Sequence, residues 1–214
     1  MLAILIPVKL FAAAKMRLSA RFSDDDRAGL ASALCEDLFA TIDKVRGVDQ
    51  IYVTSQEDLA LGWARERGWK IIPETEQVSE SKSVDDASRD CEAEGVTALL
   101  RLPIDIPLVE HEDIEAILEA APSAPSVVLV PSHDGTGTNA LLRSPPTVFP
   151  SSFGPNSFRK HTAAAGIRGV AVRVVQNERI GLDIDDGDDL ARVLPRLRPG
   201  SATQIWCAAR GLRA

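Results

Sequence analysis

Short apolar runs alternate with longer stretches of helical periodicity along the chain, and this alternation limits the fold more than any other feature. A first strand is expected at Leu2–Val8, and residues 24–45 repeat leucine or isoleucine every four residues, as one face of a helix requires. Because the apolar runs are nearly continuous, both faces of the sheet must be covered. The sequence therefore predicts an α/β fold with a mixed, mostly parallel sheet between helices.

Further elements follow the same alternation. Strands are expected at residues 50–54, 70–72, 98–102, 127–130 and 169–175. Helices are expected at residues 59–67, 83–94, 112–121, 157–165 and 188–197. The sequence shows no linker and no internal repeat, so residues 1–214 are expected to form a single domain. The apolar residues Ile205, Trp206 and Cys207 are interpreted as a docking strand or part of an interface.

Composition and charge exclude several classes of partner. The 214 residues carry a net charge of −7 and the pI is about 5, so no nucleic acid is expected as a partner. The three cysteines form neither a metal-binding spacing nor a disulfide framework, which indicates a cytoplasmic protein. No segment approaches the roughly 18 apolar residues of a membrane span, so no membrane partner is expected. The N-terminus, cut short by Pro7, is expected to be a strand rather than a signal peptide.

Two polar, glycine-containing segments follow the predicted strand at 127–130 and are candidates for ligand contacts. Residues 134–142 read Asp-Gly-Thr-Gly-Thr-Asn-Ala-Leu-Leu and include Thr138 and Asn139. Residues 153–158 read Phe-Gly-Pro-Asn-Ser-Phe and include Gly154 and Ser157. Glycine lets the backbone approach a ligand, and backbone N–H and side-chain O–H groups supply neutral donors. Such donors suit the phosphate or carboxylate of a small anion, although each segment alone is equally compatible with a surface turn.

His161 follows these segments on a predicted helix, and we include it among the candidate substrate-binding residues. A lone histidine in such a position is more often structural than catalytic. No Ser-His-Asp or Cys-His arrangement can be argued from the sequence. Any reaction is therefore expected to be metal-assisted and to proceed without a protein nucleophile.

A cluster of cations follows the first predicted strand. Lys9, Lys15 and Arg17 lie within nine residues, next to Pro7 and Val8 at the end of the strand. Arginine can grip phosphate through two N–H groups and lysine acts as a point charge, so this loop is a candidate site for a nucleotide triphosphate. Neither a P-loop pattern nor a dinucleotide-binding glycine fingerprint is present, and a solvated basic turn is the alternative.

Three aspartates near the ends of predicted strands are candidate metal ligands. Asp105 stands in an apolar, proline-flanked segment, where an unpaired carboxylate is costly to bury. Asp183 and Asp185 alternate with apolar residues, which puts both carboxylates on one face of an extended segment. Mg²⁺ prefers one or two carboxylates together with substrate phosphates. The sequence therefore predicts that the three aspartates hold Mg²⁺ across a triphosphate, with helix capping by Asp183 and Asp185 as the alternative.

Taken together, these motifs resemble the family of 2-phospho-L-lactate guanylyltransferases and their phosphoenolpyruvate-using relatives, which act in the biosynthesis of coenzyme F420. The resemblance rests on an ordered set of segments, at residues 6–9, 14–18, 102–108, 135–142, 153–161 and 182–190. It implies a Rossmann-like α/β/α sandwich of the GT-A nucleotidyltransferase type, with GTP and a small phosphorylated acid as substrates. The acid would be 2-phospho-L-lactate, phosphoenolpyruvate or 3-phosphoglycerate, which accepts GMP while pyrophosphate is released.

The resemblance also implies roles for the candidate residues. Thr138, Gly154 and Ser157 would hold the acid, the three aspartates would hold Mg²⁺, and the three cations would face the triphosphate. The family often has a Leu-Asn pair where this chain has Val84 and Asp85. Asp85 is therefore counted as nucleotide-binding, with a changed base preference or activity as the expected consequence. A second departure, Ile104-Asp-Ile-Pro107 in place of Ala-Asp-Leu-Pro, keeps the aspartate.

Two alternative functions remain at this point. Another GT-A nucleotidyltransferase, acting on a sugar phosphate or the molybdenum cofactor, would usually carry a glycine-rich loop after the first strand. This chain has no glycine between Met1 and Arg27, which argues against that alternative. A catalytically silent nucleotide-binding module would bind GTP without releasing pyrophosphate, and Asp85 keeps this alternative open. The sequence does not fix the oligomeric state, for which a homodimer is one option.

Overall fold

The computed structural model describes residues 1–213, and within them seven strands form one sheet in the order β3-β2-β1-β4-β6-β5-β7. Neighbouring strands are parallel except that β6 runs antiparallel to both β4 and β5. This confirms the predicted mixed, mostly parallel sheet. The strands are β1 (Leu2–Val8), β2 (Gln50–Ser55), β3 (Lys70–Pro73), β4 (Ala98–Arg101), β5 (Ser126–Pro131), β6 (Thr138–Ser144) and β7 (Ala171–Val174).

Helices connect the strands and close the chain. They are α1 (Asp24–Ile42), α2 (Asp58–Glu66), α3 (Glu80–Ala93), α4 (His111–Glu119), α5 (Ser157–Ile167), α6 (Glu178–Gly181), α7 (Gly187–Val193) and α8 (Ala202–Ala209). Short 3-10 turns are η1 (Phe11–Ala13), η2 (Met16–Leu18) and η3 (Leu194–Arg196). Across residues 1–213, every helix is too short or too polar to cross a lipid bilayer.

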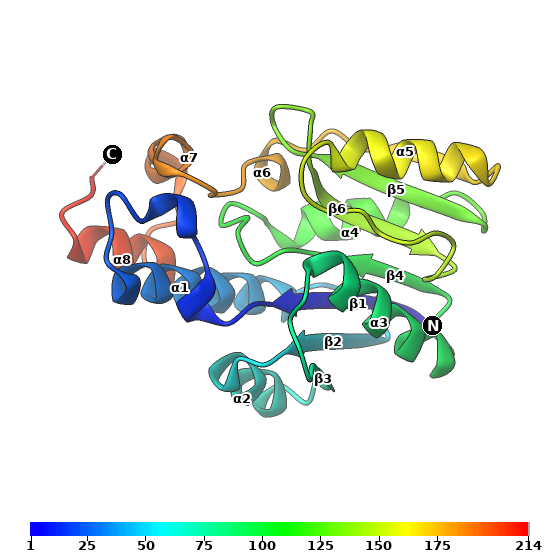
Figure 1. Ribbon diagram of the computed structural model, residues 1–214, viewed down its shortest axis with the longest axis horizontal. Coiled ribbons are helices and arrows are strands. Elements are labelled where there is room, and N and C mark those ends of the chain that lie inside the picture. The colour runs from blue at the N-terminus through cyan, green and yellow to red at the C-terminus, as the bar shows by residue number, and fades with distance from the viewer. Residues whose placement is uncertain (214) are drawn as a thin grey trace.

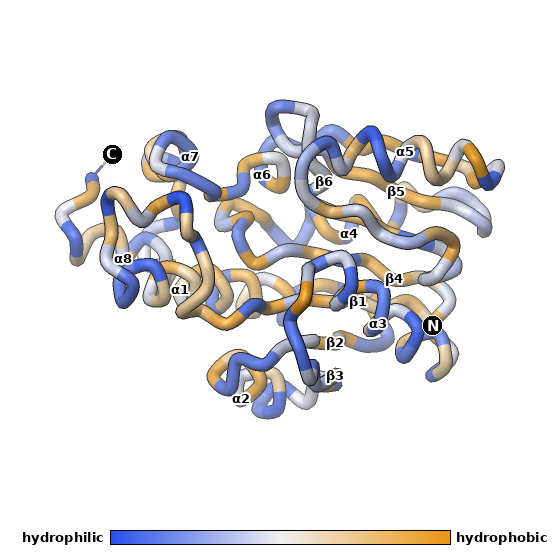
Figure 2. The backbone as a smooth tube through the Cα atoms, in the orientation of Figure 1, coloured by the Kyte–Doolittle hydropathy of each residue, from blue (hydrophilic) through white to orange (hydrophobic). Residues whose placement is uncertain are grey.

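The helices cover both faces of the sheet, giving three layers (Figure 1). Alternate residues of β1 point to opposite layers: Ile4 packs in the cluster that contains Ile114 of α4, whereas Leu5 packs with Val84 of α3. Helices α1 and α2 share the α4 side, and α5 shares the α3 side. In Figure 2, β1, β4 and β5 are mostly hydrophobic, while α3 is largely hydrophilic. The two-sided burial explains why the strands read as continuous apolar runs.

Two elements differ from the sequence interpretation. Residues 138–144 form strand β6, although their polar start was read as a loop approaching a ligand. Residues 202–209 form helix α8, so the apolar segment around Trp206 is not a strand. The buried carboxylate of Asp37 on α1 accepts the N–H groups of Ala202 and Thr203 at 2.8 and 2.9 Å. These bonds satisfy two free donors of the first helical turn and come from a residue far away in the sequence, whereas the Gln204 N–H donates to the adjacent Ser201 Oγ.

The topology gathers several chain segments at one edge of the sheet. The parallel strands β1, β2 and β4 all end at this edge, and the antiparallel strand β6 begins there. Along the chain, β2 and β3 are added on one side of β1, whereas β4 is added on its other side. The order of strand addition therefore reverses between β1 and β4. Ligand sites of open α/β sheets typically lie at such a reversal.

Candidate active site

Two cavities open at the edge of the sheet where β1, β4 and β6 meet. The first, of about 730 Å³, is named the β1 cavity, and its lining includes Pro7, Val8, Lys9 and Lys15. The second, of about 470 Å³, is named the β6 cavity, and its lining includes Thr138, Asn139, Gly154, Ser157 and Asp183. Both are bounded by a shared wall formed by Arg17, Glu80, Arg101, Pro103, Asp105 and Asp185. Most of the residues predicted from the sequence are thus brought together.

Three carboxylates lie where the two cavities meet. One oxygen each of Asp105, Asp183 and Asp185 lies within 4.8 Å of the others. The Ile184 N–H donates to the Asp105 carbonyl at 3.0 Å, which holds the segment before α7 against the loop that follows β4. Burial, and then the nearby Asp105 carboxylate, raises the pKa of Asp183 to about 6 and also raises the pKa of Asp185. Ionisation of Asp183 and Asp185 is therefore unfavourable in this setting. A bound divalent cation would offset the repulsion between the carboxylates.

Lys15 reaches into this carboxylate group. Its Nζ donates to Asp105 Oδ2 at 2.8 Å and to the Ile184 carbonyl at 2.5 Å, and its side chain is only 7% exposed. Its backbone has a positive φ of 55°, which is uncommon for a residue other than glycine. Burial opposes ionisation of Asp105, but the charges of Lys15 and Arg101 outweigh it and lower the pKa of Asp105. Asp105 is therefore the carboxylate held ionised, with Lys15 as its counterion.

The other two candidate cations line the β1 cavity and are exposed. Arg17 Nη1 contacts Asp185 Oδ2 at 2.9 Å, but the arginine side chain stays 70% exposed. An exposed pair of this kind contributes only about 0–1 kcal/mol, so Arg17 is available to an entering anion. Lys9 is exposed directly after Pro7 and Val8 at the end of β1. The β1 cavity is therefore suited to a ligand with several negative charges.

Asn139 lines the β6 cavity and also positions one of the carboxylates. Its Nδ2 donates to Asp183 Oδ1 at 3.0 Å. The same amide donates to the carbonyl oxygens of Ile180 and Gly181 at 2.8 and 3.1 Å. These bonds tie the start of β6 to the segment that carries Asp183. A residue predicted to contact substrate thus also builds the candidate metal group.

Gly154 and Ser157 complete the β6 cavity at the start of α5. Gly154 has a φ of 98°, a conformation that side chains rarely tolerate, and its carbonyl accepts the Ser157 N–H at 3.1 Å. Ser157 and Thr138 are almost fully buried, with exposed fractions of 2% and 5%. The three residues expected to bind the acid therefore line one cavity, although they come from β6 and from the loop before α5.

His161 lies behind the β6 cavity, fully buried, and within residues 1–213 it is not part of the cavity lining. The Ser152 N–H donates to Nε2 at 2.8 Å, which requires an unprotonated Nε2. The proton is therefore on Nδ1, which donates to Thr138 Oγ1 at 3.0 Å. Burial, followed by the charges of Arg143 and Arg101, lowers the pKa of His161 to about 4. The sequence placed His161 against the substrate, whereas the structure uses it to position Thr138.

Acid is expected to destabilise the protein through His161. The folded-state pKa of about 4 lies below the ordinary value of 6.5, so the unfolded chain takes up a proton first as the pH falls. This stabilisation is complete above about pH 6.5 and is lost as the pH falls toward 4, by about 2 kcal/mol between pH 7 and pH 5. Chemical denaturation at both pH values measures the loss. His161→Gln should lose correspondingly less, and equal losses in the two proteins would contradict the assignment.

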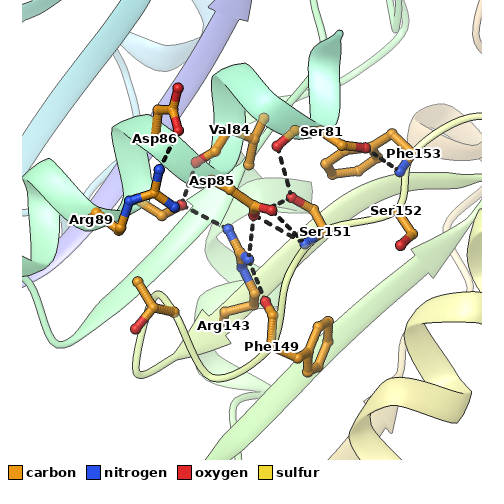
Figure 3. Close-up of polar contacts among 12 residues, drawn as sticks. Ser81, Val84, Asp85, Asp86, Arg89, Arg143, Phe149, Ser151, Ser152 and Phe153 are labelled. Atoms are coloured by element: carbon orange, nitrogen blue, oxygen red, sulfur yellow. Dashed lines mark hydrogen bonds and ion pairs between the residues drawn. The ribbon is translucent and has the colours of Figure 1, made fainter.

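Asp85, on α3, points toward Arg143 and Ser151 (Figure 3). It lies outside both cavities of the described residues. Its carboxylate accepts from Arg143 Nη1 at 3.1 Å and from the Ser151 N–H at 3.0 and 3.1 Å. Arg143 is 2% exposed and also donates to the Phe149 carbonyl at 2.8 Å and to Ser88 Oγ at 2.7 Å. The sequence assigned Asp85 to the nucleotide. The structure instead uses its charge to balance a buried arginine that β6 places beneath α3.

Two charged residues of the shared wall were not predicted. Arg101 ends β4 and is 5% exposed, and Glu80 begins α3. Burial lowers the pKa of Arg101 to about 10, against the opposing effect of Asp105 and Asp183, so the guanidinium stays charged at neutral pH. The sequence interpretation treated residues 98–102 as an apolar strand. A charged residue inside so short an apolar run is the signal that could have identified Arg101.

Residues 2–202 match the family model described as "Guanylyl transferase CofC like". The chain belongs to this family. A phosphoenolpyruvate guanylyltransferase of Rubrobacter xylanophilus is 37% identical over 188 residues, which cover 88% of this chain and 91% of that protein. A 2-phospho-L-lactate guanylyltransferase of Methanothermobacter thermautotrophicus is 32% identical over 190 residues, which cover 89% and 82%. The relatives of this CofC-like chain are thus named for two different acids.

A solved structure resembles this CofC-like chain over its whole length. A protein from Desulfovibrio desulfuricans G20, whose description names a nucleotide-diphospho-sugar transferase, superposes with a TM-score of 0.78. The superposition covers 98% of this chain and 95% of that one at 14% sequence identity. At this identity the likeness concerns the fold alone, and it confirms the predicted nucleotidyltransferase-type α/β sandwich.

Proposed function

We propose that this chain transfers GMP from GTP to a phosphorylated three-carbon acid, with release of pyrophosphate, as a step in coenzyme F420 biosynthesis. The observation that carries the proposal is the shared wall between the two cavities. The β1 cavity, whose lining includes several cations, meets the β6 cavity at Asp105, Asp183 and Asp185. The β6 cavity holds neutral donors, among them Thr138 and Ser157, beside a larger number of carboxylates. Membership of the CofC-like family and the names of the curated relatives support the same reaction.

The proposed reaction joins two anions at the shared wall. An oxygen of the acid's phosphate attacks the α-phosphorus of GTP, the bond from that phosphorus to the bridging oxygen breaks, and pyrophosphate leaves with the electron pair. The attacking phosphate is already ionised at neutral pH, so no general base is required. This fits the histidines of the described residues: His161 is neutral, buried and behind the β6 cavity, and His133, which lines that cavity, contacts Arg192. The chain's own task is to hold both substrates in line and to balance their charge.

The aspartate group fits Mg²⁺, which would supply charge neutralisation at the phosphate oxygens. The fit rests on carboxylate oxygens that lie within 4.8 Å of one another and on the raised pKa of Asp183. Lys15 already contacts Asp105 at 2.8 Å, so it must share this carboxylate with the ion or move to a phosphate. Cations of the β1 cavity are assigned to the triphosphate, and neutral donors of the β6 cavity to the acid.

Pyrophosphate release tests the proposal. Purified protein with Mg²⁺ and GTP is supplied in turn with 2-phospho-L-lactate, phosphoenolpyruvate and 3-phosphoglycerate, and with glucose 1-phosphate as a sugar-phosphate control. Release that depends on one acid would support the proposal and identify the acceptor. Release with the sugar phosphate alone would point to another nucleotidyltransferase. A rise in melting temperature with GTP, without release in any mixture, would favour a silent nucleotide-binding module.

Removal of divalent metal is expected to abolish pyrophosphate release. Without a cation, the three carboxylates repel the phosphates that must approach them, because like charges a few ångströms apart are unfavourable. The same assay with excess EDTA measures the loss, and added Mg²⁺ should restore the rate. Full activity in EDTA would remove the metal from the proposal.

A further inference from the structure

Arg101 occupies a central place at the edge of the sheet. It is the last residue of β4, and β4 lies between β1 and β6, where the order of strand addition reverses (Figure 1). It belongs to the shared wall and therefore lines both the β1 cavity and the β6 cavity. With an exposed fraction of 5%, it is a buried cation in the wall that separates the two cavities proposed to hold the substrates.

The guanidinium of Arg101 is held firmly but is not fully satisfied. Nη1 donates to the Asn139 carbonyl at 3.2 Å, and Nη2 pairs with the carboxylate of Glu80. The centre of the Phe153 ring lies 4.2 Å from the guanidinium carbon. Nε is buried and has no hydrogen-bond partner within residues 1–213. An unpaired buried donor costs about 1–3 kcal/mol, so the protein retains Arg101 at a cost to its stability.

Arg143 provides a comparison, because it is also a buried arginine and lies on β6, the strand that pairs with β4. Its guanidinium is matched by Asp85, Ser88 and the Phe149 carbonyl. It is absent from the lining of both cavities, within the residues that the structure describes. Arg143 therefore has a structural role, whereas Arg101 lines both cavities and keeps one buried donor, Nε, unpaired within residues 1–213.

The surroundings of Arg101 are built from α3. Ser81 Oγ accepts the Phe153 N–H at 2.8 Å (Figure 3). This bond helps to hold the Phe153 ring, which lies beside the Arg101 guanidinium. One helical turn further on, Asp85 holds the Ser151 N–H of the same loop. The first residue of the same helix, Glu80, supplies the carboxylate that pairs with Arg101. Helix α3 thus positions both the counterion and the aromatic neighbour of this arginine.

We propose that Arg101 is a catalytic residue that binds the two phosphate groups at the point where they meet, the acceptor phosphate and the α-phosphate of GTP. The inference rests on the proposed function. Glu80 is the counterion of Arg101 in the absence of substrate, and the more highly charged phosphates replace it on binding. The guanidinium then neutralises charge as the new oxygen–phosphorus bond forms and pyrophosphate departs.

Steady-state kinetics test this role. Arg101→Met is expected to lower kcat by about 10²- to 10³-fold, because a charged donor at the reacting phosphates is lost. Arg101→Lys keeps the charge without the two-pronged geometry and should recover part of the loss. The matched control is Arg173→Met, at an exposed arginine on β7 outside both cavities. It should leave kcat and KM unchanged.

Two outcomes would contradict the proposed role of Arg101. A kcat for Arg101→Met within about threefold of the parent would overturn the inference, since loss of one such donor elsewhere costs far more. Equal impairment of the lysine and methionine variants, together with equally lowered melting temperatures, would assign Arg101 a structural role instead.

Binding of GTP separates this inference from the proposed function, because it needs no acceptor and no turnover. Arg101→Met should weaken GTP binding, measured by calorimetry with Mg²⁺, about ten- to hundredfold. Glu80→Gln leaves the arginine in place and removes its competitor, so it should strengthen GTP binding about two- to fivefold. Unchanged GTP binding in both variants would overturn the role of Arg101. Failure of every acid to react, with these shifts present, would overturn only the choice of acceptor.

Discussion

Asp105→Asn is expected to lower turnover by on the order of a hundredfold or more while the fold stays intact. The amide keeps the shape of the side chain but removes the charge that faces Lys15 at 2.8 Å, and with it one member of the carboxylate group. Lys15 keeps its hydrogen bond to the Ile184 carbonyl, and the Asp105 carbonyl still accepts the Ile184 N–H. The rate of pyrophosphate release measures the effect, with the thermal midpoint recorded alongside.

Asp90→Asn is the matched control for this substitution, because Asp90 is exposed on α3 and lies outside both cavities of the described residues. It should leave turnover unchanged. Near-normal turnover of Asp105→Asn would remove Asp105 from the metal site. Loss of turnover together with loss of folding would mean that its pairing with Lys15 is needed for stability rather than for chemistry.

Asp85→Asn is expected to reduce the free energy of unfolding by about 2–4 kcal/mol, although asparagine is the residue that the family often carries there. The reason is Arg143, which is 2% exposed and loses the only opposite charge shown to pair with it in residues 1–213. A neutral amide also accepts the Ser151 N–H less strongly than a carboxylate does. Denaturant unfolding at neutral pH measures the change.

A double-mutant cycle isolates the pairing. Combining Asp85→Asn with Arg143→Leu removes both charges, so the combined loss should be smaller than the sum of the single losses. Strict additivity would show that the two residues do not act as a pair. Asp86→Asn is a control on the same helix, since Asp86 pairs with the exposed Arg89 (Figure 3) and with the exposed Lys82. It should cost about 1 kcal/mol or less.

Local patterns were enough to predict most of the fold, and they failed where contacts between distant segments decide. β1 was predicted with its observed bounds, because a buried parallel strand is apolar at every position. β6 was missed because Thr138 and Asn139 at its start resemble a polar turn. Helix α8 was missed because its apolar residues 205–207 resemble a strand, although Ser201 caps the helix locally. Only the contribution of Asp37 to its first turn comes from more than a hundred residues earlier.

The same limit applies to the site. The three aspartates could be grouped from sequence because the ends of strands in such a sheet meet at one edge, which is a general rule of topology. Asp85 and His161 were assigned to ligands because their partners are invisible in the sequence. Arg143 reaches Asp85 from β6, and the Ser152 N–H reaches His161 from a separate loop. A polar residue can be recognised as structural only when its partner is known.

The two sides of the candidate site differ in how much conformational entropy the protein must lose when a ligand binds. Because β6 is antiparallel, Thr138 is paired with Pro131 of β5 at the edge where the site lies, so its backbone is ordered before any ligand arrives. Fixing one backbone residue costs about 1–2 kcal/mol, and fixing a long charged side chain costs up to about 2 kcal/mol. Lys9 and Arg17 are exposed on the β1 side and must lose that freedom when they grip a triphosphate. If the proposed assignment holds, the acid enters a side of the site that is already ordered, whereas the nucleotide has to order the side chains that hold it.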